Sequence, residues 1–190
     1  MRLANLIHRE HRTAPETHSN NVKLITGSLL GAIAAILQSA GLFGGVGYIF
    51  SIMATGPIVL ATLTSLRIGF LTYMVTGLLL MIIQPSEVLV FLFTTGLLGV
   101  SLGAGFRKAK RQTTVTFIGG LALASGIMAL LYVFRFPVLG PGVSTNINAV
   151  VPAGIFVFSL FYSFIWMRLS MTGMKYLNRI IVRNTILEKN

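Results

Sequence analysis

The chain consists of long hydrophobic stretches that are separated by short polar segments. The clearest stretch covers residues 88–106, which carry no charge. As a helix that rises about 1.5 Å per residue, it would reach about 28 Å, close to the hydrocarbon thickness of a bilayer. The same pattern predicts five more transmembrane helices, over residues 22–43, 48–65, 70–83, 113–134 and 149–167. We therefore expect an all-α, polytopic membrane protein with a six-helix transmembrane domain over residues 22–170.

The positions of Lys and Arg predict how these helices are oriented. Arg107, Lys108, Lys110 and Arg111 directly follow the 88–106 helix, and short basic connections stay on the cytoplasmic side. With that side assigned, Arg135 is the only one of the fifteen Lys and Arg residues that falls outside. Both termini are then cytoplasmic, as a basic N-terminal tail over 1–21 and an amphipathic, basic C-terminal tail over 171–190. The expected location is the cell membrane, with multiple passes.

Several polar residues and one proline predict where helices begin or break. Asn20 or Asn21 can cap the first helix. Ser86 and Glu87 suit the start of the fourth helix, by capping and by their interaction with the helix dipole. Glu87 therefore has a structural interpretation beside any functional one. Pro57 is expected to kink the second helix or to mark the start of a shorter one.

Small residues recur at every fourth position in two of the predicted helices. Gly27, Gly31 and Ala35 form such a stripe in the first helix, and Gly99 and Gly103 form a second pair in the fourth. Stripes of this kind let another helix approach closely. For the first stripe, that helix belongs either to a partner protein that docks there or to this same chain. The sequence leaves both interpretations open.

Composition agrees with a membrane protein and excludes some functions. Hydrophobic residues make up 54% of the chain and charged residues only 10%, which is too little polar surface for a water-soluble globule. The net charge of +11 is explained by anionic lipid and the positive-inside rule rather than by nucleic acid. The chain has no cysteine, which excludes disulfides and thiolate catalysis.

Enzymatic chemistry is not indicated by the sequence. Glu87 is the only acidic residue between Glu16 and Glu188, and neither a Walker A loop nor a Gly-x-Ser-x-Gly elbow occurs. The three histidines lack an accompanying carboxylate or cysteine pattern, so we expect no metal site and no cofactor. The interiors of the predicted helices are uncharged, unlike those of an ion-coupled carrier. We expect a protein that is not an enzyme, and any transport would be energised by another subunit.

Residues 51–111 combine several helix and turn features. These are a proline-led second helix (Pro57), a Leu66-Arg67-x-Gly69 turn, a proline in the next outer turn (Pro85), and a glycine-rich fourth helix over 96–105 that runs into a basic loop. In this combination the stretch resembles the substrate-binding S components of energy-coupling factor (ECF) transporters and the related YybS-like membrane proteins.

The resemblance implies a six-helix subunit that binds a vitamin or another micronutrient as its small-molecule ligand. A transmembrane coupling subunit and ATPase subunits would supply the energy for uptake. The stripe of Gly27, Gly31 and Ala35 is similar to the alanine-rich motif by which S components dock on the coupling subunit, with glycines at two positions. The alternative function is a non-transporting membrane scaffold or assembly protein, in which the glycine stripes serve only packing. No motif names the ligand.

A subunit that captures a solute from outside needs polar groups at the outer ends of its helices. The sequence predicts the following substrate-binding residues there: Gln38, Tyr48, Gln84, Glu87, Tyr132, Arg135, Asn146 and Asn148. Arg135 is preferred, because as the only outward cation it can bind a carboxylate or a phosphate. Its alternative role is that of an interfacial Arg that reaches the lipid headgroups, and Asn148 can equally be the N-cap of the sixth helix.

Overall fold

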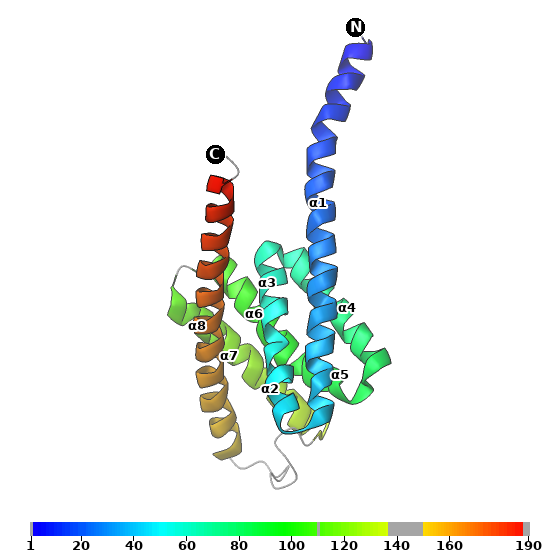
Figure 1. Cartoon of the computed structure of the whole chain (residues 1–190). Helices are drawn as coiled ribbons and strands as arrows, with labels where there is room; N and C mark the ends of the chain where they lie inside the picture. Colours follow the sequence, from blue (N-terminus) through cyan, green and yellow to red (C-terminus); the bar gives the residue numbers. More distant parts are fainter. Residues whose placement is uncertain (1, 110, 137–149, 188–190) are drawn as a thin grey trace.

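The computed structural model describes the backbone of residues 2–109, 111–136 and 150–187, with side chains over 20–109, 111–136 and 150–175. The described part is helical apart from short connections (Figure 1). In chain order the helices are α1 (Arg2–Ser39), η1 (Ala40–Phe43), α2 (Val46–Met53), α3 (Thr55–Thr64), α4 (Leu66–Ile83), α5 (Pro85–Phe93), α6 (Thr95–Lys108), α7 (Gln112–Met128), η2 (Ala129–Val133) and α8 (Val150–Leu187).

Among the described residues, six segments are long and apolar enough to cross a membrane, and the predicted all-α fold with six membrane-spanning helices is thereby confirmed. They are Asn20–Phe43, Val46–Thr64, Leu66–Ile83, Pro85–Lys108, Gln112–Val133 and Val150–Lys175. Three of them are composite, because α2 continues into α3, α5 into α6, and α7 into the π-helical turn η2. The start of α1 and the end of α8 extend to the same side of the bundle (Figure 1), as an even number of spans requires.

The first and last helices are longer than their membrane spans. Helix α1 begins at Arg2, so the predicted N-terminal tail is helical and continuous with the first span. Asn20 and Asn21 lie inside this helix, and the prediction that one of them caps it was wrong. Residues 16–26, where the polar tail meets the apolar span, contain neither glycine nor proline, so the sequence has no helix-stop signal at that boundary. Helix α8 likewise continues to Leu187, while side chains beyond residue 175 lie outside the described ones.

Two of the membrane segments break in the middle. The first break, at Ala54, comes just before Pro57, which lies in the first turn of α3, where its missing N–H leaves no helical hydrogen bond unmade. The predicted interruption at this proline is confirmed. The second break, at Thr94 (φ −123°, ψ −88°), involves no proline and was not predicted. Gly126 of α7 packs against the carbonyl of Phe93 beside this break, where a Cβ atom would clash.

Helices α1 and α4 pack through the first glycine stripe. The hydroxyl of Thr72 donates a hydrogen bond to the carbonyl of Gly27, and that of Thr76 donates to the carbonyl of Gly31, each at 3.1 Å. A Cβ atom on Gly27 would lie only 2.6 Å from Cγ2 of Ile68. The stripe therefore permits close contact within this chain, as its internal-packing interpretation expects.

Helices α3 and α6 pack through the second glycine pair. A Cβ atom on Gly99 would lie 2.8 Å from Cβ of Ile58, and one on Gly103 would clash with Thr62. Both glycines are buried. The two glycines therefore let α6 approach α3 at backbone distance.

In the part of the chain whose side chains are described, buried hydrophobic residues form two clusters. One joins α1, α3, α4 and α5 and comprises Ala34, Ala35, Ile58, Leu80, Val88 and Phe91. The other is centred on α6, α7 and α8 and includes Leu98, Leu102, Leu123, Ile127, Trp166 and Met167. A cavity lies beside both clusters, where the ends of α2 and α5 face α7 and α8.

Candidate functional site

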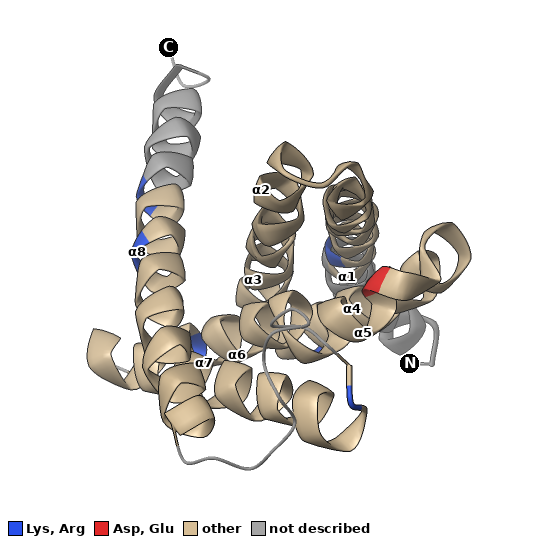
Figure 2. Ribbon diagram, turned by 90° about the horizontal axis from the view of Figure 1, so that it is seen from below, with Lys and Arg blue, Asp and Glu red and all other residues tan. Residues whose placement is uncertain are grey.

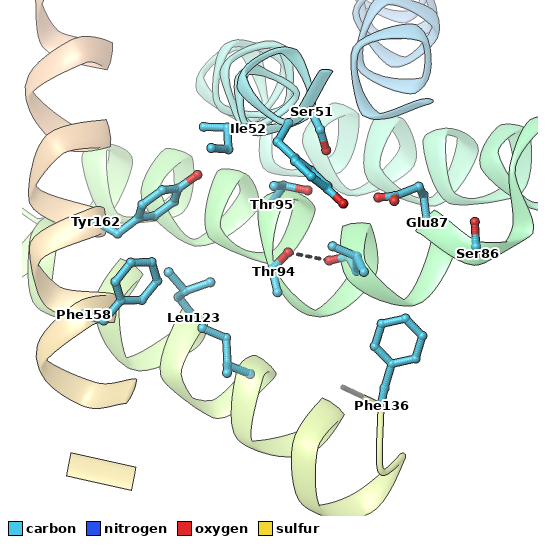
Figure 3. A pocket seen from close by; sticks show the side chains of 13 residues that line it. Ser51, Ile52, Ser86, Glu87, Thr94, Thr95, Leu123, Phe136, Phe158 and Tyr162 are labelled. Carbon is cyan, nitrogen blue, oxygen red and sulfur yellow. Dashed lines mark hydrogen bonds between the residues drawn. The ribbon is translucent and has the colours of Figure 1, made fainter. Parts of the chain in front are cut away.

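A cavity of about 500 Å³ opens among α2, α5, α6, α7 and α8 (Figure 3). This volume lies in the range of pockets that hold small organic molecules. Its polar lining comes from α2, from the beginning of α5, from the break between α5 and α6, and from α8: Tyr48, Ser51, Ser86, Glu87, Thr94, Thr95 and Tyr162. The cavity thus lies toward the connections that Figure 1 shows on the side opposite the chain termini.

A chain of two side-chain hydrogen bonds joins three helices at one wall of the cavity. The hydroxyl of Thr95 donates to Oε1 of Gln38 at 2.8 Å. The Nε2 of Gln38 donates to Oε2 of Glu87, also at 2.8 Å. Gln38 is fully buried, and because a carboxylate only accepts hydrogen bonds, its amide nitrogen must face Glu87. These two hydrogen bonds hold the Glu87 side chain in place at the edge of the cavity.

Glu87 is the only acidic side chain in the part of the chain whose side chains are described (Figure 2). It lies in the first turn of α5, where the helix dipole favours a negative charge, as predicted. Ser86 does not cap this helix, because the N-cap position belongs to Gln84 and no side-chain cap bond forms there. No Lys or Arg is among the described residues that line the cavity. The carboxylate therefore faces the cavity without a cationic neighbour in its described lining.

Aromatic side chains line much of the remaining wall. Phe158 and Tyr162 of α8 face the cavity with their ring centroids 5.7 Å apart and their planes 28° from parallel (Figure 3). Tyr48 and Phe136 add two further rings. Phe158, Tyr162 and Trp166 follow one another at four-residue spacing and so share one face of α8, and Trp166 is buried against the bundle at 7% exposed.

Three of the predicted substrate-binding residues come together. Tyr48 and Glu87 line the cavity, and Gln38 binds Glu87 from behind. Gln84 lies nearby at the start of α5, but it is buried with its Oε1 unpartnered and does not line the cavity.

The other predicted residues are not part of this cavity's described lining. Tyr132 belongs to η2 and packs against the α6–α8 cluster, with a buried hydroxyl that finds no partner among the described atoms. Arg135 is exposed, has a positive φ of 51°, and is not among the described lining residues, so its binding role stays a prediction. The end of η2 directs Phe136 to the cavity instead. Asn146 and Asn148 lie outside the described residues.

Sequence reasoning missed most of the residues that the fold brings to the cavity, and four of them are instructive. Ser51, Thr95, Phe158 and Tyr162 all lie inside apolar stretches, where hydroxyls and rings are ordinary membrane-helix residues. The i, i+4 spacing of Phe158 and Tyr162 was a usable signal for a shared face. Nothing local indicated that the face would meet a carboxylate from another helix.

The lining offers a bound molecule one charge, several hydroxyls and a set of aromatic rings. Among the described residues, no three His, Cys, Asp or Glu side chains gather as a metal site would require. No family profile, curated protein or solved structure matches the chain.

Proposed function

We propose that this chain is the substrate-binding membrane subunit of an ECF-type uptake transporter for a vitamin or another micronutrient. In this proposal it is not an enzyme, both termini are cytoplasmic, and the cavity opens to the outside of the cell membrane. A separate transmembrane coupling subunit and ATPase subunits supply the energy. The observation that carries the proposal is the Glu87 carboxylate, which Gln38 holds at a cavity of about 500 Å³.

The free-energy cost of removing Gln38 and Glu87 from water supports a binding role. A fully buried Gln and a carboxylate within the six-helix domain lose hydration, which their mutual hydrogen bonds only partly replace. If these two positions served only helix packing, apolar residues would stabilise the bundle equally well or better. A few polar groups that converge on a largely apolar cavity are instead typical of small-molecule sites.

The scarcity of acidic side chains supports an external source of energy. Glu87 is the only carboxylate within the described membrane spans, so these spans hold no pair or relay of acids for coupling to protons or sodium. Transport by this chain would therefore depend on work done by other subunits.

The internal packing of the first glycine stripe bears on how those subunits would dock. Gly27 and Gly31 are covered by α4, and Ala35 is buried in the cluster that joins α1, α3, α4 and α5. We therefore propose that the coupling subunit binds another surface of the bundle. The same packing favours the alternative function, a non-transporting scaffold or assembly protein whose glycines serve only the fold.

The test is mass spectrometry of small molecules that co-purify with the full chain in mild detergent. If the proposal holds, wild-type protein carries a specific solute, and Phe158→Ala or Glu87→Gln reduces its recovery at least about tenfold. Ile82→Ala is the matched control, because Ile82 is 82% exposed on α4, away from the cavity. Equal small-molecule content in all four proteins would contradict the transport proposal and favour the scaffold.

A further inference from the structure

The charge of the cavity is set by a single group. Oε2 of Glu87 accepts the hydrogen bond from Gln38, and Oε1 accepts none from a described residue. The lining supplies hydroxyls but, in the part of the chain that the structure describes, no cation. An ionised Glu87 therefore leaves the cavity with one uncompensated negative charge.

Gln38 orients this carboxylate without neutralising it. An amide N–H is an uncharged donor, and the other end of the Gln38 amide is already engaged by the hydroxyl of Thr95. A carboxylate removed from water is stabilised best by a cation that also donates hydrogen bonds to it. The free Oε1 is available for such a donor.

The opposite wall suits the same kind of ligand. Phe158 and Tyr162 present two rings whose centroids lie 5.7 Å apart, and Tyr48 and Phe136 add two more. Aromatic faces attract cations and stack on planar rings. A ligand that carries a positive charge and a flat ring would satisfy both walls at once.

We infer that this cavity binds a small organic cation that bears an aromatic ring, with its charge at Glu87 and its ring against Phe158 and Tyr162. The inference rests on the proposed function, in that the cavity must bind a solute at all. It also replaces the anion-binding role expected of Arg135, which is not among the lining residues.

The experiment compares three indoles of similar size and different charge on the purified full chain: tryptamine, tryptophol and indole-3-acetate. At pH 7 the first carries an ammonium group, the second is neutral, and the third is a carboxylate. We expect tryptamine to bind wild-type protein at least about tenfold more tightly than tryptophol, with indole-3-acetate weakest.

Two variants at position 87 test whether the preference for tryptamine depends on the charge of the Glu87 side chain or on its shape. Glu87→Gln can still accept the hydrogen bond from Gln38 through its amide oxygen, but it removes the charge, and the preference for tryptamine should fall below about threefold. Glu87→Asp keeps the charge and should retain most of the preference.

Phe158→Ala should weaken the binding of tryptamine and of tryptophol together, because it removes part of the ring contact. Thermal unfolding of each variant checks that the fold is intact.

The inference is overturned if tryptophol or indole-3-acetate binds wild-type protein as tightly as tryptamine, or if Glu87→Gln keeps the full preference. It is also overturned if none of the three indoles binds at millimolar concentration. In each case the proposed function is decided separately by the co-purification result, because a solute of another class could still be recovered from wild-type protein and lost from the cavity variants.

Discussion

Gln38 and Glu87 lie forty-nine residues apart in the chain and are joined by a hydrogen bond of 2.8 Å between the amide nitrogen and the carboxylate. The bond links the last turn of α1 to the first turn of α5. It also gives the helix-initiating carboxylate a second role at the cavity wall. The dipole interpretation and the binding interpretation of Glu87 are therefore compatible, since its position in the first turn serves both.

The Gln38 hydrogen bonds should contribute measurably to stability. Gln38→Leu leaves Glu87 and Thr95 without their partner in a buried setting, and we expect the free energy of unfolding to fall by about 2–3 kcal/mol. Denaturation of the purified protein in detergent measures this change. Thr26→Ala is the control, because Thr26 is exposed and bonds only the carbonyl of Val22 in its own helix. If both variants lose the same stability, the Gln38 bonds do not hold the bundle together.

The first glycine stripe should be required for folding of the isolated chain. A Cβ atom on Gly31 would already lie 3.2 Å from the hydroxyl of Thr76, so Gly31→Leu should force α1 and α4 apart and cost about 1–3 kcal/mol or more. Thermal unfolding in detergent measures the effect.

Gly154 supplies the matched control for Gly31→Leu, because nothing lies within 4 Å of a Cβ atom placed there. Gly154→Leu should therefore leave the unfolding temperature nearly unchanged. A Gly31→Leu protein of wild-type stability that fails only to assemble with a coupling subunit would restore the docking interpretation of the stripe.

Arg107 should stabilise the end of α3, in addition to its contribution to the orientation of the chain in the membrane. Its Nη1 donates hydrogen bonds to the carbonyls of Leu63 and Thr64, at 2.7 and 3.3 Å, and such carbonyls lack partners within the helix. We expect Arg107→Ala to lower the free energy of unfolding by about 1–2 kcal/mol. Lys108→Ala removes the same charge from the same exposed connection and should cost much less. Equal losses would mean that the charge, and not the hydrogen bonds, is responsible.

The charge distribution predicts the orientation in the cell membrane. Reporter fusions after Lys110 and at Asn190 should report the cytoplasm, and insertions within residues 140–145 should report the outside. Cysteine-accessibility labelling in intact cells is an independent measurement of the same sides. A cytoplasmic signal from the 140–145 insertions would refute the proposed orientation.

Local sequence patterns were sufficient to predict the membrane segments and one of the two helix breaks. The transfer of a helix into hydrocarbon depends on the length and polarity of that helix, so six apolar stretches predicted six spans. Proline acts on its own helix as well, and the break before Pro57 follows from its fixed φ and missing N–H. The break at Thr94 has no proline; there the hydroxyl of Thr94 donates to the carbonyl of Val90, and Gly126 of another helix packs beside the break.

The sequence by itself determined which residues enter the membrane, whereas only the tertiary structure decided which of them meet. Gln38 and Glu87 were both expected at the outer helix ends, but their bond to each other, and the bond to Thr95, depends on how α1, α5 and α6 are rotated against one another. The rotation of α8 likewise turns Tyr162 to the cavity, whereas Arg135, which follows η2, is not among the described lining residues. Apolar surface is favourable on any side of a membrane helix, so hydrophobicity sets the depth of a residue and not its partners. Those partners follow from close packing between helices, at contacts such as the α3–α6 and α1–α4 glycine pairs.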